Sequence, residues 1–180
     1  MVSTSLRDSR IRRICLDALL VAVAMMLSYL EVLLPLDAII PLPGFRLGLA
    51  NVVVLLTFCL ISPKDAAVIS ALRILLMGLL FGSVTSLYFS AMGGLLSFLV
   101  LLAVSKLGQR ISFVGVSVLC AAAHNCGQMA AAVTLFGTSL IFSYLPFLLL
   151  AAVIFGAIVG VLLNLLVPKL QKPIGKGRAV

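Results

Sequence analysis

Long apolar segments follow one another along this chain and leave little sequence for anything else. A helix that crosses a membrane needs about 20 apolar residues, and six segments approach or reach that length. They are about Ile14–Leu34, Leu47–Ile61, Ala66–Phe81, Leu87–Ser105, Ser112–Phe136 and Phe142–Val167. Hydrophobic residues make up 63% of the chain and charged residues 10%, whereas soluble domains contain about 45–50% and 25%. The pattern predicts an all-α integral membrane protein, built as a bundle of six transmembrane helices.

This composition allows one membrane domain, residues 14–167, between a basic N-terminal segment (1–13) and a basic tail (168–180). The second and third apolar segments are short. Either their helices extend into the flanks, or irregular backbone folds back into the bilayer, which is tolerated only where protein or a water-filled cavity surrounds it. The first segment is longer than the apolar region of a secretory signal and no small-x-small cleavage site follows it, so we expect a retained helix.

The basic residues predict the orientation of the bundle. Eleven of the 13 Lys and Arg residues fall in the two terminal segments, the second-to-third loop and the fourth-to-fifth loop. Because basic residues mark cytoplasmic loops, both termini are expected in the cytoplasm. The same rule accounts for the net charge of +8, so we expect contact with membrane lipid and no binding of nucleic acid.

Seven polar residues interrupt the apolar segments or flank them, and we predict that they bind a substrate. They are Glu31, Arg46, Asn51, Arg73, His124, Asn125 and Gln128. Polar groups at such depth cost several kcal/mol unless they are paired, hydrated or bound to a ligand. A cluster that opens outward would form a pocket for a small molecule. The alternative is structural: an ion pair of Glu31 with Arg46 or Arg73, and amides that join helices.

The charges of these residues favour a particular ligand class. Two arginines against one glutamate leave the predicted pocket positive, unless Asp37 in the external loop offsets the excess. Guanidinium groups bind carboxylates and phosphates through two parallel hydrogen bonds. We therefore expect an anionic, partly apolar ligand.

No metal, cofactor or catalytic centre is expected. His124 is the single histidine of the chain, and its spacing from Cys120 and Cys126 matches no common metal-ligand pattern. The four cysteines lie in apolar segments without a CxxC motif. There is no Walker A motif, no acidic cluster that would hold Mg²⁺ and diphosphate, and no nucleophile with a base and an orienting partner. We expect that the chain is not an enzyme.

Small residues recur four apart in three of the predicted helices. The pairs are Ala18 and Ala22, Ser90 and Gly94, and Gly156 and Gly160. Such faces let helices approach closely, either inside one bundle or with a partner. Packing inside the bundle is one interpretation. The other is a docking surface, for which Ala18 and Ala22 are the best candidates, with Asp17 capping the interaction or pairing with Arg13.

Several motifs together resemble the bacterial Gx transporter family, which is labelled heptaprenyl diphosphate synthase component I. The motifs are Pro43-Gly44-Phe45-Arg46-Leu47-Gly48-Leu49-Ala50-Asn51, Ser62-Pro63-Lys64-Asp65-Ala66, Leu72-Arg73-Ile74-Leu75, Phe81-Gly82, Gly93-Gly94-Leu95-Leu96-Ser97 and Ala123-His124-Asn125-Cys126-Gly127-Gln128. The family is in turn similar to the substrate-binding S components of energy-coupling factor (ECF) transporters. That similarity implies six helices, cytoplasmic termini, a location in the bacterial inner membrane, and docking of the Ala18 and Ala22 motif on a coupling subunit served by two ATPases.

Two functions follow from the resemblance. The first is a substrate-binding subunit that takes up a small molecule, energised by separate ATPases. The second is a non-catalytic membrane accessory subunit, either of isoprenoid or quinone synthesis or of an extracytoplasmic electron-transfer system. A synthase activity of the chain itself is not expected, because prenyl diphosphate synthases need acidic clusters for Mg²⁺ and none is present.

Overall fold

Six α-helices and one short 3₁₀ helix make up the part of the chain that the structure describes. The computed structural model describes residues 2–33, 46, 48–106, 111–137 and 139–174. No strand occurs within these ranges. The helices are α1 (Val2–Leu33), α2 (Asn51–Leu60), α3 (Pro63–Phe81), α4 (Val84–Ser105), α5 (Phe113–Phe136), η3 (Ser139–Tyr144) and α6 (Leu145–Ile174).

Each predicted apolar segment overlaps one of the α-helices. The first helix begins at Val2 and therefore includes nearly all of the basic segment that we had separated as residues 1–13. Of the two short segments, the third extends into its flank and begins at Pro63. The second instead shrinks to ten residues, preceded by a turn at Leu49 and Ala50.

Four of the helices are long and apolar enough to cross a membrane. These stretches are Ile11–Leu33, Val84–Ser105, Phe113–Phe136 and Phe142–Gln171. Of the other two, α2 is too short for a full crossing, and α3 carries Lys64, Asp65 and Arg73 within 19 residues. The all-helical membrane architecture is therefore confirmed, with four candidate spans.

Serine side chains start three of the helices. Ser62, Ser83 and Ser112 each accept a hydrogen bond from the backbone N–H three residues ahead, which satisfies one of the free N–H groups at a helix start. Pro63 occupies the first position of α3, where its missing N–H costs nothing. These caps explain why α3 begins before the apolar segment does.

Close packing of small residues holds α5 against α6. A Cβ added to Gly160 would lie 2.4 Å from Val114 Cα, and one added to Gly156 would lie 2.7 Å from Val118 Cα. Packing inside the bundle therefore accounts for this pair of small residues. Ala18 and Ala22 differ, because both are exposed on α1.

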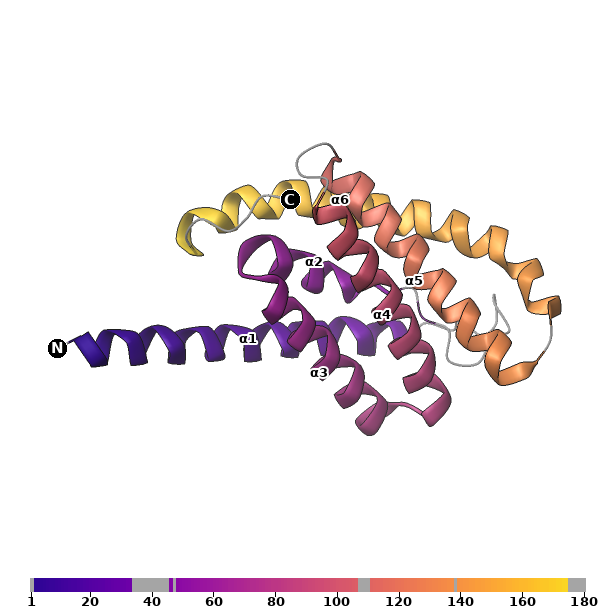
Figure 1. Cartoon of the computed structure of the whole chain (residues 1–180), viewed down its shortest axis with the longest axis horizontal. Helices are drawn as coiled ribbons and strands as arrows, with labels where there is room; N and C mark the ends of the chain where they lie inside the picture. Colours follow the sequence, from indigo (N-terminus) through magenta and orange to yellow (C-terminus); the bar gives the residue numbers. More distant parts are fainter. Residues whose placement is uncertain (1, 34–45, 47, 107–110, 138, 175–180) are drawn as a thin grey trace.

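The helices run back and forth through the molecule. In Figure 1 the start of α1, the turn between α2 and α3 and the last turns of α6 lie toward the left, and the turn between α3 and α4 lies at the opposite end. Buried apolar residues form a core where α2, α4, α5 and α6 meet and a smaller one between α1, α2 and α3. The buried polar side chains of the described residues come from α1 to α5, and α5 contributes four of them: Ser117, His124, Asn125 and Gln128.

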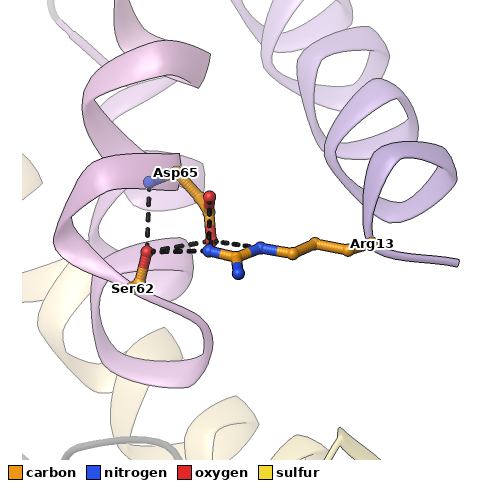
Figure 2. A network of polar contacts seen from close by, with 3 residues as sticks. All are labelled: Arg13, Ser62 and Asp65. Carbon is orange, nitrogen blue, oxygen red and sulfur yellow. Dashed lines mark hydrogen bonds and ion pairs between the residues drawn. The ribbon is translucent and has the colours of Figure 1, made fainter. Parts of the chain in front are cut away.

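An ion pair ties α1 to the start of α3. Arg13 Nη2 lies 2.6 Å from Asp65 Oδ2 and 2.8 Å from Oδ1, and Arg13 Nε lies 3.1 Å from Oδ2. Arg13 also donates to Ser62 Oγ at 3.3 Å, as Figure 2 shows. We call Arg13, Ser62 and Asp65 the clamp. Arg13 thus pairs with Asp65 and not with Asp17, the partner that the sequence had suggested.

Candidate functional site

Four of the seven predicted site residues line one small cavity. Side chains of α1, α3, α4 and α5 meet there with the segment before α2, and the lining residues are Ser28, Glu31, Arg46, Gly48, Arg73, Ile74, Met77, Ser90 and His124. We call this the polar cavity. Its volume is about 10 Å³, which is about the space that one water molecule needs. A larger ligand would have to widen it.

Arg73 lies deep in the bundle and contacts α1 and α2. Its side chain is 5% exposed. Nη1 donates to Ser28 Oγ at 3.4 Å and Nη2 donates to Asn51 Oδ1 at 3.3 Å. Both bonds are long, and Nε has no partner among the described residues. This guanidinium therefore keeps a hydrogen-bond donor available.

Arg46 lines the cavity and contacts α4 and α5. Its Nη2 and Nε donate to Ser86 Oγ at 2.8 and 3.2 Å. Its backbone N–H donates to Gln128 Oε1 at 3.3 Å. Among the described residues, the side-chain donors of Arg46 therefore bond to one hydroxyl oxygen and to no carboxylate.

His124 and Gln128 are joined on one face of α5, as their spacing of four residues predicts. Gln128 Nε2 and His124 Nε2 lie 2.9 Å apart. Because Gln128 Oε1 already accepts from Arg46, the Gln128 amide nitrogen faces the ring and donates to it. The ring proton then lies on Nδ1, which has no partner among the described residues. Nδ1 lies against α4, since a Cβ added to Gly93 would be 2.8 Å from it, and Gly93 is not among the lining residues of the cavity.

Glu31 forms no ion pair with either arginine. Its side chain is 3% exposed and accepts a hydrogen bond from the backbone N–H of Leu49. Among the described residues, the pair between Arg13 and Asp65 is the one ion pair with N···O within 4.0 Å. The pairing of Glu31 with Arg46 or Arg73, which the structural alternative required, is therefore absent from the described part of the chain.

Gly48 is the position where backbone comes closest to these side chains. Its φ of 80° lies in the left-handed region that favours glycine. A Cβ there would meet Asn51 Nδ2 at 2.9 Å and His124 Cδ2 at 3.1 Å. Glycine therefore allows the segment before α2 to pass directly over the His124 ring.

The other predicted residues fall into three groups. Asn51 and Gln128 bond to residues of the cavity without lining it. Asn125 lies apart: its amide donates to the Leu148 carbonyl of α6 at 2.6 Å, which is a contact between helices, and its contact with substrate stays a prediction. Ala18 and Ala22 lie on the exposed face of α1, away from the cavity.

Sequence reasoning missed the serines and the glycine of the site. Ser28 and Ser86 each accept from an arginine, and Gly48 lines the cavity. One signal was present for Ser28, which lies three residues before Glu31 and therefore on the same face of α1. No group of three His, Cys, Asp or Glu side chains in the described ranges could hold a metal ion.

One comparison with known proteins gives a match. The model of the family described as heptaprenyl diphosphate synthase component I matches residues 20–166. This range includes every lining residue of the polar cavity. No curated protein matches the chain, and no solved structure does.

Proposed function

The chain belongs to the heptaprenyl diphosphate synthase component I family, and we propose that it is a membrane subunit that binds a small anionic molecule for uptake. In this proposal the chain crosses the bacterial inner membrane six times and both termini lie in the cytoplasm. The four long helices and α3 make five of the crossings, and α2 together with the chain that leads into it makes the sixth. Separate ATPases, connected through a coupling subunit, supply the energy, as in the ECF S components that the sequence resembles. The chain itself catalyses no reaction.

One observation carries the binding proposal: within the described part of the chain, two buried or half-buried arginines line one cavity and form no ion pair. Arg46 and Arg73 carry two positive charges against the single carboxylate of Glu31. Arg73 Nε also has no hydrogen-bond partner among the described residues. Unpaired buried charge costs several kcal/mol, and ionisable groups inside membranes are by default functional. A carboxylate or phosphate would neutralise the excess charge and accept from these donors.

A second function is favoured by the family description itself. A component of a synthase implies a partner component, so the chain would be an accessory membrane subunit of isoprenoid or quinone synthesis. An extracytoplasmic electron-transfer system is a further setting for such a subunit. The polar cavity would then hold part of a product or intermediate while a partner performs the chemistry.

Affinity purification of the detergent-solubilised protein distinguishes the two functions. Recovery of a coupling subunit and ATPases supports uptake, whereas recovery of a soluble prenyltransferase supports the accessory role. Leucine at both Ala18 and Ala22 should disrupt the association, because larger side chains fill a close helix contact. Unchanged recovery with these variants would mean that α1 does not carry the docking surface.

Mass spectrometry of small molecules that co-purify with the protein tests the binding proposal directly. We expect an anionic compound that is absent from preparations of Arg46→Ala and Asn51→Ala. The folded fraction of both variants should remain close to that of the wild type. An equal loss of fold and of compound would assign the polar residues a structural role instead.

A further inference from the structure

A second cavity lies directly beside the polar cavity, between α2, α5 and α6. Most of its wall is apolar: Leu55 of α2, Ala121 of α5, and Phe155 and Val159 of α6. We call it the apolar cavity. Its volume is about 20 Å³, so it holds about one water molecule in this form of the protein.

The two cavities share a wall. Gly48 lines both of them. Asn51 lines the apolar cavity and accepts a hydrogen bond from Arg73, which lines the polar one. The segment from Gly48 to Asn51 therefore separates a region of excess positive charge from an apolar region, and at Gly48 no side chain adds to the barrier.

One buried polar atom faces the apolar cavity without a partner. Ser117 lines this cavity, its side chain is 2% exposed, and its hydroxyl forms no hydrogen bond within the described part of the chain. An unsatisfied buried hydroxyl costs about 1–3 kcal/mol. Because a hydroxyl both donates and accepts, the Ser117 side chain suits a single polar atom on an otherwise apolar group.

We infer that the ligand is amphiphilic and occupies both cavities. Its anionic group lies between Arg46 and Arg73, and a compact apolar portion extends past the Gly48–Asn51 segment into the apolar cavity, where one oxygen or nitrogen meets Ser117. The inference rests on the proposed binding function and adds where the apolar part of the expected ligand lies: the apolar cavity selects an organic anion with an apolar body over an inorganic anion or a polar metabolite.

The contacts at the shared wall indicate how the apolar portion of the ligand reaches the apolar cavity. The Arg73–Asn51 bond is long, at 3.3 Å, and Asn51 Oδ1 is a neutral acceptor. An incoming carboxylate is a stronger acceptor for the guanidinium. It weakens the Arg73–Asn51 bond and frees the Asn51 amide to donate to the ligand, so that binding of the anionic group opens the path for the apolar portion.

Matched probes test the inference on the full chain in lipid nanodiscs. Phenylpropionate carries both groups, acetate carries only the anion, and phenylpropanol carries only the apolar part. Burial of a phenyl ring contributes about 1.5–3 kcal/mol. We therefore expect phenylpropionate to bind about 10- to 100-fold more tightly than acetate, and more tightly than phenylpropanol.

Filling the apolar cavity should remove this advantage. Ala121→Leu should bring the dissociation constant of phenylpropionate close to that of acetate, while acetate still binds, which also reports an intact fold. Ala121→Val serves if the leucine variant does not fold. Ala130→Leu is the matched control, because Ala130 is exposed on the same helix, and it should leave both probes unaffected.

Ser117 is tested with a fourth probe, 3-(4-hydroxyphenyl)propionate. Its hydroxyl should tighten binding about fivefold relative to phenylpropionate, as one hydrogen bond of about 1 kcal/mol predicts. Ser117→Ala should abolish that difference.

The outcomes separate the inference from the proposed function. If acetate and phenylpropionate bind equally, or if the advantage of phenylpropionate survives in Ala121→Leu, the two-cavity ligand is wrong and anion binding stands. If Arg73→Met binds both anions as tightly as the wild type does, the proposed function fails as well.

Discussion

Arg13 and Arg73 each lie near a carboxylate, but Arg13 forms an ion pair with its carboxylate and Arg73 does not. In the clamp, Nε and Nη2 of Arg13 bond to the Asp65 carboxylate, and Nη2 also bonds to Ser62. In the polar cavity, Arg73 and Arg46 bond to neutral oxygens of Ser28, Asn51 and Ser86. Glu31 bonds to a backbone N–H. The same residue types therefore connect helices at one end and remain unpaired inside.

This difference distinguishes an arginine that stabilises the fold from one that is available to bind a ligand. A structural ion pair needs only its two members, and the clamp is complete without any ligand. Arg73, in the polar cavity, keeps a donor without a partner among the described residues, in a place where an unused donor is costly. The four predictions below change residues of the clamp or residues in and around the polar cavity. Binding is measured with phenylpropionate in nanodiscs, and stability by thermal unfolding.

The largest effect is expected from replacing Arg73 with methionine. Loss of the buried guanidinium should weaken phenylpropionate binding at least about 30-fold, because truncating one member of a buried charged contact costs about 2–5 kcal/mol. The matched variant Arg13→Met removes the clamp arginine by the same change and should leave binding unaltered. Equal losses in both variants would contradict the distinction between clamp and cavity.

Gly48→Ala should destabilise the protein more than Gly137→Ala does. Both glycines have positive φ, 80° and 63°, so both variants incur about 1–2 kcal/mol of backbone strain. A Cβ at Gly48 also collides with Asn51 and His124, whereas no described atom lies within 4 Å of a Cβ at Gly137. Thermal unfolding should show the larger loss at Gly48, and similar losses would mean that the close approach relaxes freely.

Asn125→Ala should lower stability by about 1 kcal/mol and leave binding intact. The side chain bonds α5 to the Leu148 carbonyl of α6 and does not line the cavity, so its loss costs one buried hydrogen bond. Asn51→Ala is the counterpart, since Asn51 contacts Arg73 and its loss should change binding. Loss of binding in Asn125→Ala at unchanged stability would show that Asn125 takes part in ligand binding.

The smallest effect is expected in the clamp. Arg13 and Asp65 side chains are 54% and 12% exposed, and pairs near the surface contribute about 0–1 kcal/mol. Asp65→Asn should lower stability by up to about 1 kcal/mol, and 1 M salt should shrink the difference because it screens exposed charges. Lys64→Gln is the control on the same helix turn, and a larger effect there would contradict the role of the pair.

Much of the site could be named from the sequence, but not its contacts. Glu31, Arg46, Arg73 and His124 stood out because charged or titratable residues are rare in apolar segments. Serines and alanines are common there, so Ser28, Ser86 and Ser117 carried no comparable signal. Asn125 and Gln128 looked alike in the sequence, although one faces α6 and the other bonds to His124.

The sequence by itself determined the class of protein and the approximate positions of its helices, because apolar length acts locally along the chain. Only the tertiary structure decided which polar groups meet. Arg46 and Gln128 are 82 residues apart in the chain and in contact in the fold. Whether an arginine is paired or left available depends on such distant neighbours, and that difference separates the clamp from the cavity.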